Sequence, residues 1–147
     1  MPGQPPPKPR AHPVHTCGGV AARRPSAIGY AELSVTSNFT FLTGASHPEE
    51  LVERAAALGH RAAAITDTNT LAGVVRAQVA AKRVGVPLAG GCRLAPADGP
   101  SVCVYPTDRA AYARLCRLLT LGKRRAPKGE CHLGMNDLIG HAEGLLA

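Results

Sequence analysis

Apolar and polar residues alternate along residues 30–35, and the period of the alternation lengthens further along the chain. Every second side chain in this segment is apolar, so the apolar side chains share one face, which predicts a strand. After a loop, residues 46–49 have the spacing of a helix capping box with proline in the first turn. Apolar residues at helical spacing then continue, and Gly59 is expected to end this helix.

The same order of strand and helix repeats over residues 62–85. Residues 62–66 form a short apolar run before turn-forming residues, which predicts a second strand. A second helix is predicted over residues 70–84, with Gly85 ending it. One face of this helix carries Leu71, Val74, Val75, Gln78 and Val79.

The pattern in the second half of the chain predicts two more strands and two more helices. Residues 87–92 are expected to form a third, glycine-rich strand and residues 101–105 a fourth. A helix is predicted from a cap at Thr107 to about Leu121, with its leucines facing inward. Asn136 is expected to cap a last helix at the C-terminus.

This alternation of strands and helices predicts an α/β fold built from parallel βαβ units with right-handed crossovers. Either an open doubly wound sheet or part of a β/α barrel would satisfy the pattern. A complete barrel of this kind needs more than about 200 residues. The chain has 147 residues, so we expect it to hold only the first part of such a barrel, cut short at its end.

Residues 1–28 differ in composition from the rest and hold 7 of the 13 prolines. We interpret them as a basic, disordered or polyproline tail, or as sequence upstream of the true start codon. His12, His15 and Cys17 lie in this tail, where a metal site lacks a fourth ligand. The folded domain is expected over residues 29–147.

Composition and charge exclude several classes of protein. No apolar run is long enough to span a membrane, and no apolar segment of a secretory signal follows the first basic residues. The five cysteines are widely spaced without a CxxC pair, which favours free thiols in the cytoplasm. The net charge is +7, of which +4 lies in the tail, so the charge permits contact with nucleic acid without requiring it.

Polar residues follow the first three predicted strands, at the edge where parallel β/α folds carry their chemistry. These residues are Ser34, Thr36, Asp67, Thr68, Cys92 and Arg93. The set is poor for metal binding, because only the aspartate is a good ligand and the arginine would repel a cation. A serine without a histidine beside it is also a weak nucleophile. Filling of the barrel interior is the simpler interpretation of Ser34 and Thr36.

Residues 30–77 resemble the start of a PHP domain (polymerase and histidinol phosphatase). More narrowly, they are similar to the start of bacterial error-prone DNA polymerases of the DnaE type, in the class of the DNA polymerase III alpha subunit. Residues 105–133 resemble the same subfamily. The resemblance is collinear and covers residues 29–147. It implies that this segment is the first part of a PHP-type, distorted β/α barrel.

The resemblance also allows a comparison of site residues. Active PHP domains carry His-x-His where this chain has Ser34 and Thr36. They carry Asp-His at Asp67 and Thr68, and a glutamate at Arg93, so only the aspartate is retained. The resemblance therefore implies a degenerate metal site. We hypothesise that Arg93 replaces the metal ions as the positive partner of Asp67, because an unpaired buried carboxylate is costly.

The resemblance implies a catalytically silent, structural portion of a polymerase for damage-induced translesion synthesis. It implies no cofactor in this segment, since the catalytic magnesium of the family belongs to a palm domain further along the chain. The partners it implies are the rest of the polymerase, primer–template DNA, a sliding clamp and accessory mutagenesis proteins. A metal-dependent phosphoesterase of the PHP class and a stand-alone interaction module remain alternatives.

A basic stretch near the end of the third predicted helix carries no acidic residue. Its members are Arg114, Arg117, Lys123, Arg124, Arg125 and Lys128. They indicate either a patch that contacts phosphates or docks against a protein, or a simply solvated surface favoured by the helix C-terminus. Because few aromatic residues lie nearby in the sequence, stacking with single-stranded nucleic acid is not indicated.

Overall fold

The computed structural model describes residues 28–147, so the predicted tail lies outside the described residues except for Ile28. The tail's three candidate ligands, His12, His15 and Cys17, are outside them as well. In chain order the elements are β1 (Ala31–Glu32), α1 (Pro48–Ala57), β2 (Ala62–Ile65), α2 (Val74–Val84), β3 (Leu88–Gly90), β4 (Cys92–Leu94), β5 (Val102–Pro106), α3 (Arg109–Arg124), α4 (Met135–Gly140) and β6 (Leu145–Leu146). No helix among the described residues is long and apolar enough to cross a membrane.

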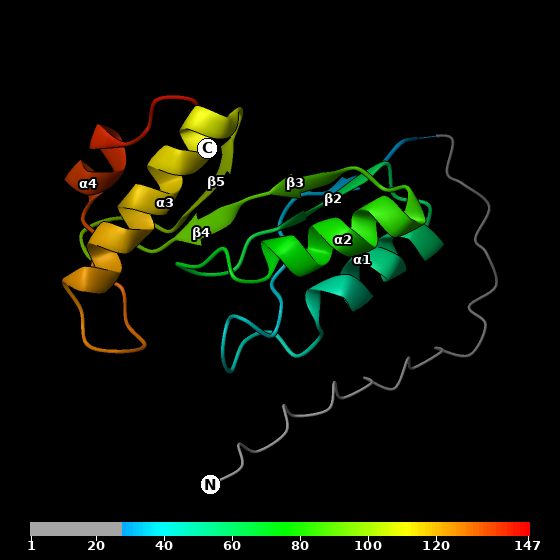
Figure 1. Cartoon of the computed structure of the whole chain (residues 1–147), viewed down its shortest axis with the longest axis horizontal. Coiled ribbons are helices and arrows are strands. Elements are labelled where there is room, and N and C mark those ends of the chain that lie inside the picture. The colour runs from blue at the N-terminus through cyan, green and yellow to red at the C-terminus, as the bar shows by residue number, and fades with distance from the viewer. Residues whose placement is uncertain (1–27) are drawn as a thin grey trace, which may run out of the picture.

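The first half forms the predicted parallel βαβ units. The strands lie in the order β1-β2-β3, all parallel, and α1 and α2 lie side by side along the sheet (Figure 1). Ala63 lies opposite Glu32 on one side and Leu88 on the other. The α/β class and the parallel arrangement of the first three strands are therefore confirmed.

The apolar face predicted for the second helix is wrong in part. Val75 and Val79 are 69% and 67% exposed, whereas Ala77, Ala80 and Ala81 are buried. The small alanine side chains allow α2 to lie directly against α1. Close packing of the two helices therefore determines which face of α2 is buried. The regular helix also begins at Val74, later than predicted.

The second half departs from the parallel pattern. The predicted third strand is interrupted after Gly90, and its continuation, β4, pairs antiparallel with β5, which in turn pairs antiparallel with β6. Only residues 95–101 connect β4 to β5. A parallel pair needs a crossover of roughly a dozen residues or more, so this connection permits only an antiparallel pair.

Three predicted helix caps are shifted by one or two residues. The cap of α1 is His47, whose N–H donates to Glu50 Oε2 at 2.9 Å. Asp108, and not Thr107, caps α3, since its carboxylate accepts from the N–H of Ala111 at 2.7 Å. The cap of α4 is Gly134, so the predicted cap residue Asn136 lies within the helix.

Each half of the fold has its own apolar cluster. One lies between the β1-β2-β3 sheet and its helices, around Val52, Ile65 and Ala77. The other lies between α3 and the antiparallel strands, around Leu94, Val104 and Leu115. Figure 1 shows the halves joined where β3 runs on into β4. The carboxyl ends of β1 and β2 point toward this junction.

Candidate functional site

The strand ends meet, as the sequence predicted for parallel strands. Thr68 forms an isolated parallel bridge with Arg93, which lies on β4. The Arg93 guanidinium donates to the hydroxyl of Ser34 at 2.8 Å. Three of the predicted residues, which lie after β1, after β2 and on β4, are therefore neighbours. Thr36 instead lines a hollow of about 320 Å³ against α1, which Ser34 also borders.

Asp67 is buried, with 1% of its surface exposed, and both oxygens of its carboxylate accept hydrogen bonds. One oxygen accepts from the N–H of Ser37 at 2.7 Å and from the hydroxyl of Thr40 at 2.8 Å. The other oxygen accepts from the hydroxyl of Ser37 at 2.7 Å. The carboxylate therefore fastens the loop after β1 to the end of β2.

The hypothesis that Arg93 pairs with Asp67 is wrong. Among the described residues, no salt bridge joins the two side chains, and Asp67 takes all three side-chain hydrogen bonds from Ser37 and Thr40. The geometry of the strands explains this. Arg93 lies opposite Thr68, and neighbouring side chains on an extended segment point to opposite faces, so Asp67 points away from the guanidinium.

The residues at the strand ends do not fit a metal ion. Both oxygens of the Asp67 carboxylate are engaged by hydrogen-bond donors, and Arg93 brings a positive charge. Burial raises the pKa of the Cys92 thiol to about 12, and this thiol donates to the backbone carbonyl of Asp67 at 3.3 Å. Within residues 28–147, no three side chains from histidine, cysteine, aspartate and glutamate gather as a metal site would require.

Tyr105 and Glu32 also belong to this region, and sequence reasoning missed both. The Tyr105 hydroxyl donates to the carbonyl of Leu33, which ties β5 to the chain after β1. Burial raises the pKa of Tyr105. The hydroxyl of Tyr30 donates to Glu32 at 2.6 Å and lowers the pKa of that carboxylate. The Tyr105 contact depends on how the strands pair, which the spacing of residues does not reveal, whereas Tyr30 and Glu32 lie two residues apart on one face of the predicted strand, so the alternation could have indicated their contact.

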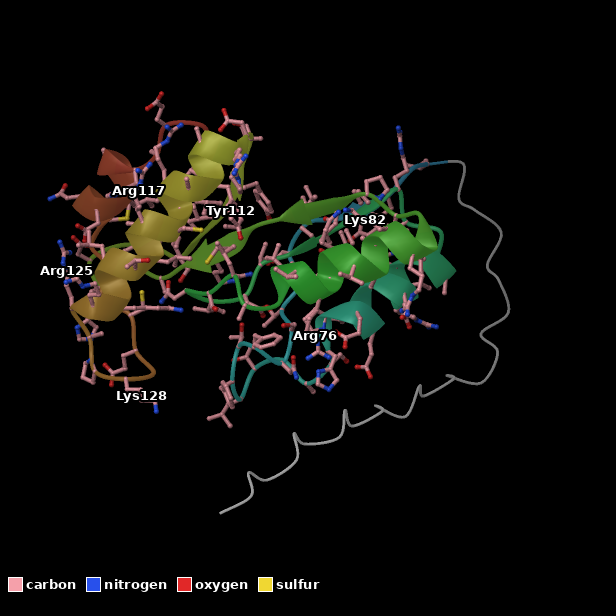
Figure 2. All side chains as sticks on the ribbon, in the orientation of Figure 1. Arg76, Lys82, Tyr112, Arg117, Arg125 and Lys128 are labelled. Atoms are coloured by element: carbon pink, nitrogen blue, oxygen red, sulfur yellow. The ribbon has the colours of Figure 1, made fainter. Side chains whose placement is uncertain are left out.

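The predicted basic patch is divided by the structure. Arg125 pairs with the carboxylate of Asp137 at 2.7 Å, and Arg114 donates through Nε to the backbone carbonyl of Glu143 at 2.8 Å and lies 3.7 Å from the carboxylate of that residue. Arg117, Arg124 and Arg125 border a shallow hollow of about 440 Å³ on α3. Lys123 and Lys128 lie elsewhere, on the side toward the loop after β1. Figure 2 shows Arg117 on α3, Arg125 at the C-terminal end of that helix and Lys128 on the loop that follows it.

A third hollow, of about 650 Å³, lies between the loop after β1 and the loop after α3. Its lining consists of Phe39, Phe41, Thr68, Asn69, Thr70, Lys123, Pro127, Lys128, Gly129, Glu130, Cys131 and His132. We call it the Phe–Lys hollow. Figure 1 shows the two loops extending from the same side of the molecule. Sequence reasoning missed it because the phenylalanines and the lysines are far apart along the chain.

The model of the PHP domain matches residues 32–147. The chain is 58% identical over 118 residues to an error-prone DNA polymerase of Caulobacter vibrioides, covering 80% of this chain and 11% of that protein. It is 47% identical over 139 residues to an error-prone DNA polymerase of Rhodopirellula baltica, covering 95% of this chain and 12% of that protein. The chain thus spans only about a tenth of the length of these relatives.

Among solved structures, the fold is similar to an amidohydrolase from Chromobacterium violaceum, solved with bound sulfate and without metal. The TM-score is 0.54 at 27% identity, over 65% of this chain and 34% of that one. Since the family model covers most of the chain, the protein belongs to the PHP domain family. Within that family its sequence is similar to the error-prone DNA polymerases.

Proposed function

We propose that this chain is the N-terminal PHP portion of an error-prone DNA polymerase and that it acts as a structural scaffold in that enzyme. The proposal is supported by the family match and by 47–58% identity to error-prone polymerases. The scaffolding role is inferred from the strand ends, where an active PHP domain would need metal ligands. There, the Asp67 carboxylate holds a loop in place.

The single observation that carries the scaffolding role is the set of contacts around Asp67. A buried carboxylate that accepts three short hydrogen bonds, with both oxygens in use, stabilises the loop it binds, and a metal ion would have to displace one or more of these donors. Its neighbours Thr68 and Arg93 add a hydroxyl and a guanidinium. Neither group activates water for phosphoester hydrolysis.

The wider role follows from the same relatives. We propose damage-induced translesion synthesis of DNA in the cytoplasm as the activity of the whole enzyme. Its catalytic magnesium would be held by a palm domain outside these residues. Its partners would be the rest of the polymerase, primer–template DNA, a sliding clamp and accessory mutagenesis proteins. Arg117 and Arg124 make no ion pair within residues 28–147, and we propose that they bind one of these partners.

A phosphoesterase assay separates this proposal from the enzymatic alternative. The purified chain is incubated with p-nitrophenyl phosphate and a nucleoside monophosphate, with Mn²⁺ or Zn²⁺ added or with a chelator. We expect no hydrolysis above the protein-free blank under any condition. Metal-dependent turnover that the substitution Asp67→Ala abolishes would overturn the scaffolding role and favour a phosphoesterase.

A further inference from the structure

We propose that the Phe–Lys hollow binds single-stranded DNA, with a base stacked on Phe41 and phosphates held by Lys123 and Lys128. This adds a binding site to a region for which only scaffolding is proposed above. It does not depend on that role, because it is argued from the side chains of this chain alone.

The first observation is an aromatic ring held out into solvent. Phe41 is 87% exposed, and its neighbour Leu42 is fully exposed with a φ of 64°. Exposure of a large apolar side chain to water is unfavourable, and a partner that covers this side chain would gain the free energy of burying it. Phe39, two residues earlier, lines the same hollow. Two rings are therefore available on one side of it.

The second observation is that the loop presenting these rings is firmly held. Asp67 accepts from Ser37 and Thr40 on either side of Phe39, and the hydroxyl of Thr40 also accepts from the N–H of Thr68 at 3.0 Å. The loop is closed tightly as well, since a Cβ on Gly44 would lie 2.1 Å from the carbonyl oxygen of Ser37. A preorganised ring binds with a smaller entropy cost than a mobile one.

The third observation is the charge across the hollow from the rings. Lys123 and Lys128 make no salt bridge or side-chain hydrogen bond within the described residues, although both line the hollow. The one acidic residue in the lining is Glu130, and its Oε2 lies 3.2 Å from Nε2 of His132, so its carboxylate does not pair with either lysine. The C-terminal dipole of α3 accounts for a lysine at position 123, but Lys128 lies beyond that helix.

Aromatic rings together with unpaired cations favour a single strand over other ligands. Proteins that bind single strands combine a positive groove with rings on which bases stack. A duplex keeps its bases stacked on each other and would offer Phe41 no free base face. An acidic peptide would pair with the lysines but would leave the rings without a flat partner. The hydroxyl and amide groups of Thr68, Asn69 and Thr70 can bond to a base edge or a phosphate.

The absence of tryptophan from the chain gives a direct test. In the full 147-residue chain, Phe41→Trp places a single tryptophan at the hollow, which is excited selectively over the three tyrosines, and Val79→Trp places one on the exposed face of α2 as a matched control. Each is titrated with a 12-residue oligothymidylate and with an abasic strand of the same length. We expect the oligothymidylate to quench the fluorescence of Phe41→Trp, the abasic strand to quench it far less, and neither to affect Val79→Trp.

The lysines are tested by the salt dependence of binding, followed by the anisotropy of a labelled oligothymidylate. Each phosphate contact on a single strand contributes about −0.7 to the slope of log K against log salt. The double substitution Lys123→Ala and Lys128→Ala is therefore expected to reduce the steepness of this slope by about 1.4. Lys82→Ala on α2, far from Lys128 in Figure 2, is the control and should leave the slope unchanged.

Removal of the ring is expected to weaken binding by roughly five-fold or more in Phe41→Ala, with affinity retained in Phe41→Tyr. Equal quenching in Phe41→Trp and Val79→Trp, equal quenching by the abasic strand, or an unchanged slope without the two lysines would overturn the proposal. Because Lys128 lies on an exposed loop, its substitution tests the proposal even if a variant at position 41 fails to fold.

Discussion

The carboxylate of Asp67 accepts two hydrogen bonds from Ser37, one from its backbone N–H and one from its hydroxyl, each 2.7 Å long. Both residues are buried. The two bonds fasten the loop after β1 to the end of β2, and this loop in turn carries Phe39 and Phe41. A residue that the sequence suggested as the remnant of a metal site thus serves to shape a loop.

Removal of this carboxylate should destabilise the fold strongly. We expect Asp67→Ala to lower the free energy of unfolding by about 2–4 kcal/mol, because charged hydrogen bonds are lost and the buried N–H of Ser37 loses its partner. Urea denaturation followed by circular dichroism measures the change. Glu53→Ala, which removes an exposed ion pair with Arg83, is the control and should cost less than about 1 kcal/mol. Equal effects of the two substitutions would contradict the role given to Asp67.

Asp67 and Arg93 should behave as energetically independent residues. A double-mutant cycle with Asp67→Ala and Arg93→Gln is expected to give a coupling energy below about 0.5 kcal/mol, since the two side chains form no ion pair. The matched cycle with Asp67→Ala and Thr40→Val should give about 1 kcal/mol or more, because the Thr40 hydroxyl donates to the carboxylate at 2.8 Å. A larger coupling with Arg93 than with Thr40 would restore the ion-pair hypothesis.

Gly122 should not tolerate a side chain although it lies within a helix. An alanine in a helix is normally more stable than glycine by about 1 kcal/mol. At Gly122, however, a Cβ would lie 2.7 Å from both Cys131 Sγ and Leu133 Cγ. We therefore expect Gly122→Ala to lower the melting temperature. Gly140→Ala, where nothing lies within 4 Å, should leave it unchanged or raise it. Stabilisation by both substitutions would show that the loop after α3 does not pack as described.

Asp137 should contribute to stability only above acidic pH. The N–H of Gly134 and then the guanidinium of Arg125 lower the pKa of its carboxylate below the usual 3.8. A lowered pKa in the folded state means that stability is present above the unfolded value and is lost as the pH falls through the folded value. The difference in unfolding free energy between the wild type and Asp137→Asn should therefore be constant near neutrality and shrink below about pH 4. A difference that is the same at pH 3 and pH 7 would contradict this assignment.

The elements that the sequence predicted well are those with a strong local pattern. The helix that ends at Arg124 has leucines at regular spacing, and the strands around Ile65 and Val104 are short apolar runs. Their existence and type follow from periodicity alone. The face of α2 could not be predicted in the same way, because both valines and alanines are apolar and only the distance to α1 decides which of them is buried.

The candidate site was predicted less completely. The meeting of Ser34, Thr68 and Arg93 follows from parallel strand ends, which the sequence indicates. The partners of Asp67 do not follow, because they depend on which face of the strand the carboxylate occupies. The Phe–Lys hollow depends on two loops that approach each other only in the folded chain. No spacing along the sequence records that approach.

The central claim is that this PHP fold is a structural part of an error-prone polymerase. The DNA immediately downstream of the codon for Ala147 tests it most directly. We predict a continuation, in frame or restored by a single frameshift, that encodes a polymerase palm with its magnesium-binding carboxylates. A stop codon followed by an unrelated gene would contradict the claim and would make a stand-alone function of these residues the better account.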